Sequence, residues 1–207
     1  MTREEARARK DLDKRETTYR KSVSKKYGWK QSSYLNWKIK GGYYFSLFHC
    51  KLEDVWLEVK PLFVDDLWWD IFEIPENKQA PKSLRGIGAF SITGPTLTKQ
   101  PVFDAAKVSQ YSDDDIECVW DGVFQRIEQE ISLFLKKNPN PAMLSPEDGG
   151  EYGRIQPLYA ILMDLHSGNK EAALEKMASF KAAKRGSGFR GPKGDAYDYI
   201  EAWCQSN

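Results

Sequence analysis

Residues 34–60 read YLNWKIKGGYYFSLFHCKLEDVWLEVK, and this stretch determines the expected fold class. Apolar and polar residues alternate over residues 35–40, which is typical of a strand with one buried face. The Gly41-Gly42 pair that follows is a two-residue turn of the kind that closes β-hairpins. Alternation returns over residues 55–60 until Pro61 stops it. Together these signals predict an antiparallel β-meander.

The turn also predicts the register of the hairpin. Residues 43–52 are apolar on both faces, as expected of a strand inside a sheet. With Gly41-Gly42 as the turn, the cross-strand pairs are Leu35 with Phe48, Trp37 with Ser46 and Ile39 with Tyr44.

Two helices are expected to flank the meander. Thr2 and Glu5 have the spacing of a capping box, and Gly28 is suited to end the helix that they open. Ser112 and Asp115 give a second capping signal before a long amphipathic helix. The apolar stripe of that helix consists of Ile116, Trp120, Val123, Ile127, Ile131 and Phe134.

The segment between these elements predicts shorter ones. Asp65 and Asp66 are suited to open a short helix. Residues 88–93 predict another strand, and residues 96–103 predict a short strand. Pro101 would confine that last strand to an edge of the sheet, because proline has no amide donor.

The organisation expected is a meander domain at residues 1–137, a linker at 138–153 and a helical subdomain at 154–207. The linker is rich in Pro and Gly, and three helical patterns follow it. The predicted fold class is therefore α+β: an antiparallel meander flanked by an N-terminal helix and a long amphipathic helix. A helical hairpin within a three-helix appendage completes it.

Composition excludes several classes of protein. Apolar residues make up 41% and charged residues 29% of the chain, unlike a disordered sequence. The charged N-terminal segment lacks the apolar core of a signal peptide, and no run approaches the roughly 18 apolar residues of a membrane span. We expect a soluble cytoplasmic protein without a membrane partner. Its three cysteines are then expected to be reduced and buried: Cys50, Cys118 and Cys204.

Motifs for catalysis, metals and cofactors are missing from the sequence. There is no CxxC, HExxH or Walker pattern, and the two histidines are far apart. Residues 186–191 read GSGFRG and match GxGxxG, but the pattern predicts a helix before them rather than the strand that a dinucleotide site requires. We therefore expect no catalytic residues, no metal site and no cofactor.

A non-enzymatic protein-binding module, of immunity or regulatory type, is the favoured function. Residues 53–76 carry eight acidic residues against one lysine, a net charge of −7. Trp68 and Trp69 point about 100° apart on a helix, so we expect that both cannot lie in the core. Trp69 would then bind a partner, cover the sheet edge or stack under a lysine. The expected partner-binding residues are Trp56, Asp66, Trp69, Asp70 and Glu73.

Two other functions stay open. Residues 170–193 carry seven basic residues against two acidic ones, and the loop at 181–194 could contact nucleic acid or be a solvated linker. An enzyme whose site is assembled from scattered residues is the third possibility. The candidate anion-binding residues are Lys184, Arg185, Phe189, Arg190 and Lys193.

Three blocks of sequence carry a resemblance to other proteins: residues 27–37, the run LWWDIF at 67–72 and the run SLRGIGAF at 83–90. With them the chain resembles small bacterial cytoplasmic proteins of helix–meander–helix plan. The resemblance covers about the first two thirds of the chain and implies a bacterial cytoplasmic protein. It implies no activity and no catalytic residues.

Overall fold

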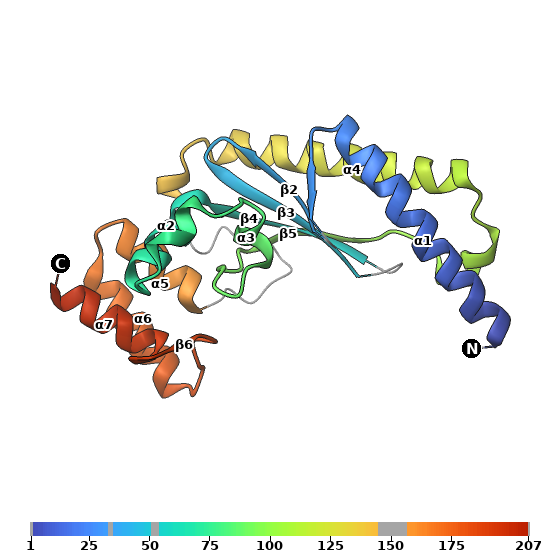
Figure 1. Cartoon of the computed structure of the whole chain (residues 1–207). Helices are drawn as coiled ribbons and strands as arrows, with labels where there is room; N and C mark the ends of the chain where they lie inside the picture. Colours follow the sequence, from blue (N-terminus) through green and yellow to red (C-terminus); the bar gives the residue numbers. More distant parts are fainter. Residues whose placement is uncertain (1, 33–34, 51–53, 145–156, 207) are drawn as a thin grey trace.

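The computed structural model describes residues 2–32, 35–50, 54–144 and 157–206. The chain is α+β, as the sequence predicted, with C-terminal helices at the end of the molecule opposite the N-terminal helix (Figure 1). Its elements are α1 (Arg3–Lys26), β1 (Lys30–Ser32), β2 (Leu35–Lys40), β3 (Tyr43–Cys50), β4 (Asp54–Pro61), α2 (Leu62–Ile71), η1 (Pro75–Gln79), α3 (Leu84–Ile87), β5 (Thr96–Pro101), η2 (Ala105–Gln110), α4 (Asp113–Lys137), η3 (Pro141–Met143), α5 (Pro157–His166), α6 (Lys170–Ala182), β6 (Arg190–Gly191), β7 (Gly194–Asp195) and α7 (Ala196–Ser206).

The meander is confirmed as a five-stranded antiparallel sheet in the order β1-β2-β3-β4-β5. Its hairpin register is the predicted one, and Gly41 and Gly42 both have positive φ, as the two-residue turn requires. β5 is an edge strand, as expected, and it ends at Pro101, two residues before the predicted end at residue 103.

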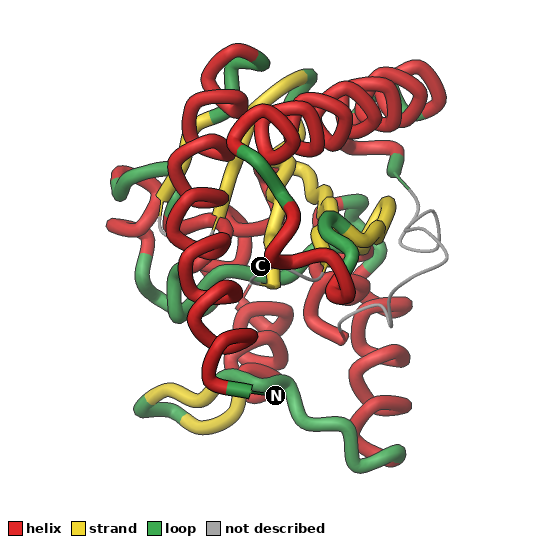
Figure 2. Tube along the Cα trace, turned by 90° about the vertical axis from the view of Figure 1, so that its right-hand side faces the viewer, coloured by secondary structure: helices red, strands yellow, loops and turns green. Residues whose placement is uncertain are grey.

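α1 and α4 lie side by side over one face of the sheet (Figure 1), and Figure 2 shows the strands between helices. Both predicted capping boxes are present, at Thr2 with Glu5 and at Ser112 with Asp115. The whole apolar stripe of α4 is buried, and Phe134 packs edge-on against Tyr43 of β3 at 5.1 Å between ring centroids.

Two expectations about the segment after β4 are wrong. α2 begins at Leu62, three residues before Asp65, so Asp65 does not cap it. Residues 88–93 form no strand, because side chains take up the backbone groups of Ile92 that a strand partner would bind: Asp65 accepts from its N–H and Lys60 donates to its carbonyl. Gly94 also approaches Val59 so closely that a Cβ there would overlap the Val59 carbonyl.

The three expected C-terminal helices are present as α5, α6 and α7, and α5 and α7 pack against α2. Their buried residues belong to the same apolar cluster as the sheet and α4. Cys118 is exposed rather than buried, because it lies on the solvent side of α4. Cys50 has no described side chain. None of the described helices combines the length and apolar character needed to cross a membrane.

Candidate functional site

The candidate site lies on the face of the sheet that α4 leaves uncovered. Alternate residues of β2, β3 and β4 point to this face, because successive side chains of a strand point to opposite sides. The register arranges them in three rows across the sheet: Leu35, Phe48 and Trp56; Trp37, Ser46 and Glu58; Ile39, Tyr44 and Lys60.

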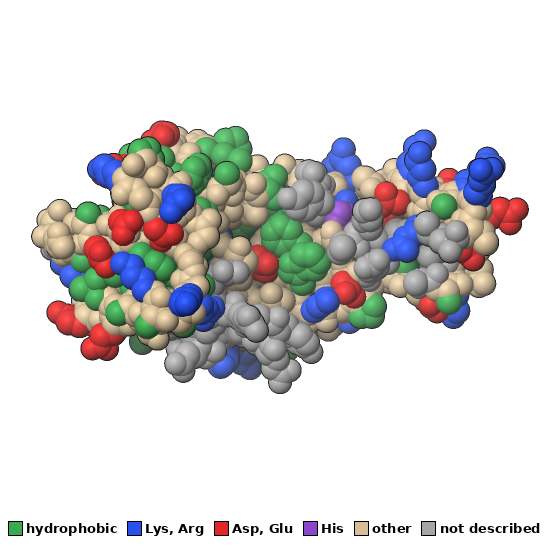
Figure 3. Space-filling view, turned by 90° about the horizontal axis from the view of Figure 1, so that it is seen from below, with side chains coloured by type: hydrophobic (Ala, Val, Ile, Leu, Met, Phe, Trp, Pro, Cys, Tyr) green, Lys and Arg blue, Asp and Glu red, His purple; other side chains and the backbone are tan. Residues whose placement is uncertain are grey.

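Part of this face is covered by α3. Gly86 of α3 packs directly on Leu35 and Tyr44, both fully buried, where no larger residue would fit. Phe48, Trp56 and Glu58 remain half-buried, and we call these three residues the open patch. Seen from below, hydrophobic side chains gather in the middle of the molecule with an acidic side chain beside them (Figure 3).

Two aromatic rings form one side of the open patch. Phe48 and Trp56 are cross-strand neighbours whose rings stack with centroids 5.8 Å apart and planes 19° apart. Lys99 of the edge strand lies opposite Trp56 and pairs with Asp54, with 2.9 Å between Nζ and Oδ2. The stack is therefore an aromatic surface that is still partly accessible to solvent.

Glu58 is the titratable group of the open patch. Burial raises the pKa of Glu58 to about 7, although the Lys60 ammonium and a hydrogen bond from the Trp56 side chain lower it. The lysines on either side, Lys60 and Lys99, are paired with other carboxylates. Within the described residues Glu58 therefore has no cation of its own.

Lys60 is held in a separate buried cluster. Its ammonium donates to Asp65 Oδ1 at 2.8 Å, to the Arg85 carbonyl at 2.6 Å and to the Ile92 carbonyl. These three contacts use all three protons of the ammonium. Burial lowers the pKa of Lys60 and raises the pKa of Asp65, and each charge opposes the shift of the other.

Two expected partner-binding residues belong to the surroundings of this cluster. The expectation that Trp68 and Trp69 cannot both be buried is wrong, since they are 0% and 2% exposed. The Trp69 indole donates to the Phe90 carbonyl at 2.9 Å, and the Arg85 guanidinium lies 4.9 Å from its ring centroid. Arg85 Nη2 also donates to Asp66 at 2.6 Å. α2 has neighbours on two sides, so it buries both rings.

The other two expected residues, Asp70 and Glu73, line a groove of about 440 Å³ between α2 and α7. Asp70 pairs with Lys78 at 2.5 Å, and Glu73 pairs with Lys193. Trp203 of α7 lines the same groove. The structure thus separates Trp56 from these carboxylates. Among the described residues, no three His, Cys, Asp or Glu side chains could share a metal ion.

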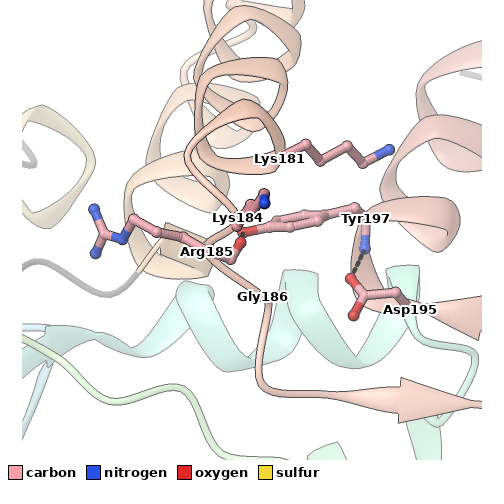
Figure 4. Close-up of a pocket in the computed structure, with 6 residues that line it drawn as sticks. All are labelled: Lys181, Lys184, Arg185, Gly186, Asp195 and Tyr197. Atoms are coloured by element: carbon pink, nitrogen blue, oxygen red, sulfur yellow. Dashed lines mark hydrogen bonds between the residues drawn. The ribbon is translucent and has the colours of Figure 1, made fainter.

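The basic residues of the alternative site border a cavity of about 340 Å³ at the end of α6. Figure 4 shows Lys181 and Arg185 pointing in opposite directions, and the Tyr197 ring reaching from α7 towards Arg185, to whose carbonyl the Tyr197 hydroxyl donates at 3.1 Å. Lys181 pairs with Glu201 at 2.7 Å, and Asp195 binds the backbone N–H of Tyr197. These cations border one cavity without converging on one point.

The remaining residues of the alternative site lie apart from that cavity. Phe189 packs at 5.3 Å from the Trp68 ring, between centroids, so its ring is partly buried in the core. Lys193 pairs with Glu73, whereas Arg190 is exposed on the short β6 strand. The ion pair between Lys193 and Glu73 therefore connects the expected anion-binding site with the expected partner-binding site.

Sequence reasoning missed Glu58 as a site residue. Its position in the alternating run 55–60 places it on the outer face, which was the available signal. Lys60 occupies an equivalent position in the alternating run, but its side chain is buried. Alternation alone therefore does not distinguish a half-buried side chain on this face from a buried one. Chemically, the open patch can stack a planar group and bind a cation or a proton.

Comparison of the chain with family models, with curated protein sequences and with solved structures finds no significant match. The resemblance of residues 27–37, 67–72 and 83–90 to small bacterial proteins stays an expectation.

Proposed function

We propose that this chain is a non-enzymatic protein-binding module that contacts its partner with the open patch. The observation that carries the proposal is the half-buried Phe48–Trp56 stack beside Glu58, whose carboxyl group forms no ion pair within the described part of the chain. Partly exposed aromatic residues are enriched among the residues that dominate the energy of protein interfaces. Of the expected partner-binding residues, Trp56 is the one that belongs to this surface.

The charges around the open patch favour a protein over nucleic acid. Binding a phosphate backbone requires free cations, whereas Lys60 and Lys99 are both engaged by aspartates. The carboxyl group of Glu58 would also repel phosphate when ionised. A cytoplasmic location belongs to the proposal as well, since an odd number of widely separated cysteines favours reduced thiols over a disulfide framework.

The proposal is tested by site-specific photo-crosslinking. A benzophenone amino acid replaces Trp56, and the purified protein is irradiated in a lysate of the source cells. The matched control carries the same group in place of Leu133, which is 63% exposed on α4. We expect a crosslinked protein specific to position 56. That protein, once identified and purified, should bind wild type and bind Trp56→Ala more weakly.

Equal crosslinking from both positions, or undiminished binding of Trp56→Ala by the purified candidate, would refute the proposal. Thermal melts of each variant check that it is folded.

A further inference from the structure

We infer that the open patch receives an arginine side chain of the partner, with the guanidinium against the Phe48–Trp56 stack and Glu58 as its counter-ion. This inference rests on the proposed function and names the chemistry that the partner must present.

The first argument is charge complementarity. Glu58 lies directly across the sheet from Ser46, a small neutral residue, two residues along β4 from Trp56 and diagonally from Phe48. Every donor proton of Lys60 is used by Asp65 and by two carbonyls, so Lys60 cannot also bind Glu58 without giving up one of these contacts. A partly buried carboxylate is favourable only when a cation or several donors compensate it. Among the residues that the structure describes, no cation forms an ion pair with Glu58, and the partner supplies one.

The second argument is the shape of the cation. A guanidinium is planar, stacks on aromatic faces and donates two parallel hydrogen bonds to a carboxylate. An ammonium is a compact, strongly hydrated charge that does not pack against an aromatic face as well. The paired rings and the adjacent carboxyl group thus fit arginine better than lysine.

The third argument is that the protein already contains this arrangement. Arg85 lies 4.9 Å from the Trp69 ring centroid and donates through Nη2 to Asp66. Tryptophan, guanidinium and carboxylate therefore combine stably within this fold. In the open patch the tryptophan and the carboxyl group are present as Trp56 and Glu58, and the guanidinium is the component to be supplied.

The inference implies that binding is coupled to a proton. A bound guanidinium favours ionised Glu58, so binding near neutral pH displaces the proton that burial retains. With a free-state pKa of about 7, affinity should rise about tenfold between pH 6 and pH 8. Among the residues described by the structure, the other charged or titratable groups on or beside this face are Lys30 of β1, Tyr44 of β3, Lys60 and Asp54 of β4, Lys99 of β5, Asp65 and Asp66 of α2 and Arg85 of α3.

The probe for the test is the blocked tripeptide acetyl-Gly-Arg-Gly-amide. Its matched control contains citrulline, which has the shape of arginine without the charge. Binding is followed by NMR through the indole N–H signal of Trp56, assigned with Trp56→Phe, at pH 6 and pH 8. We expect the arginine peptide to shift this signal with about tenfold tighter binding at pH 8. The citrulline peptide should not bind.

Variants identify the counter-ion. Glu58→Gln should abolish both the binding and its pH dependence, whereas Glu130→Gln, which changes an exposed carboxylate on α4, should leave both intact. The inference is overturned if citrulline or lysine peptides bind as well as arginine, or if Glu58→Gln binds normally. A specific crosslink from position 56 without arginine binding would refute the inference and leave the proposed function standing. If neither the specific crosslink from position 56 nor arginine binding is observed, both the proposed function and this inference are refuted.

Discussion

Asp65 and Glu58 are two carboxyl groups near Lys60, and the protein surrounds them differently. Asp65 is fully buried and receives the Lys60 ammonium and the Ile92 N–H on Oδ1, with Arg85 Nη1 at 3.6 Å from Oδ2. Glu58 is half-buried in the open patch; the Lys60 ammonium lowers its pKa from a distance, but no cation of the described residues forms an ion pair with it. The comparison teaches that compensated buried charge connects elements of the fold, whereas uncompensated charge at a partly open surface indicates a place for a partner.

The strongest test of this comparison removes the compensated carboxylate. Asp65→Ala leaves the Lys60 ammonium buried without its counter-ion, and we expect a loss of about 3–5 kcal/mol in the free energy of unfolding. Asp54→Ala breaks the exposed pair with Lys99 and should cost no more than about 1 kcal/mol. Urea unfolding curves measure both values. Equal losses would show that burial does not distinguish the two carboxylates.

Removal of the indole beside the buried cluster should have the next largest effect. Trp69→Ala creates a cavity, frees the Phe90 carbonyl and removes the ring under Arg85, so we expect a loss of about 3 kcal/mol. Trp56→Ala, in the open patch, should cost about half as much because its ring is half-buried. Denaturant unfolding of the two variants in parallel decides the order. A smaller loss of unfolding free energy for Trp69→Ala than for Trp56→Ala would contradict the expected order.

Removal of the Glu58 charge should instead stabilise the folded protein. The pKa of Glu58 is raised in the folded state, so the folded protein binds this proton more tightly and stability falls as pH rises through about 7. Glu58→Gln cannot ionise, and we expect it to exceed wild type by about 2 kcal/mol at pH 8 and by little at pH 5. Thermal melts across this range provide the measurement, with Glu130→Gln as the control. If the stability of wild type, Glu58→Gln and Glu130→Gln changed with pH in the same way, the raised pKa could not belong to Glu58.

The smallest effect is expected at the groove between α2 and α7. Glu73 and Lys193 form an exposed pair, with side chains 57% and 62% accessible. Glu73→Gln should therefore change the free energy of unfolding by less than about 1 kcal/mol, and less still in high salt. Unfolding measured at two salt concentrations tests this. A loss of unfolding free energy as large as that of Asp65→Ala would show that the Glu73–Lys193 pair stabilises the fold as a buried ion pair does.

Local sequence patterns were sufficient for the strands β2 to β5 and for the long helices, but they did not predict β1. The hairpin register follows from the turn at Gly41-Gly42 and from strict alternation, and α4 follows from an uninterrupted apolar stripe with a capping box. Each of these signals lies within one segment of chain. For that reason they could be read without knowing the tertiary packing.

The candidate site required contacts between distant segments. Helical spacing gives the angle between Trp68 and Trp69, but not the fact that α2 is covered on two sides, by residues 88–92 and by the C-terminal helices. In the same way, one strand carries Glu58 and Lys60 on one face, and the contacts of Lys60 with Asp65, Arg85 and Ile92 make their environments differ. Burial of an outward-facing residue depends on what packs over it.

The two-sided burial of α2 also ties it to the C-terminal segment. Phe63 and Trp68 of α2, and Phe72 directly after it, meet aromatic rings of that segment: His166, Phe189 and Tyr199. A protein shortened before α5 would present these rings to water as an exposed apolar patch, which favours aggregation. We therefore expect the shortened protein to need polar replacements at these positions before it stays monomeric.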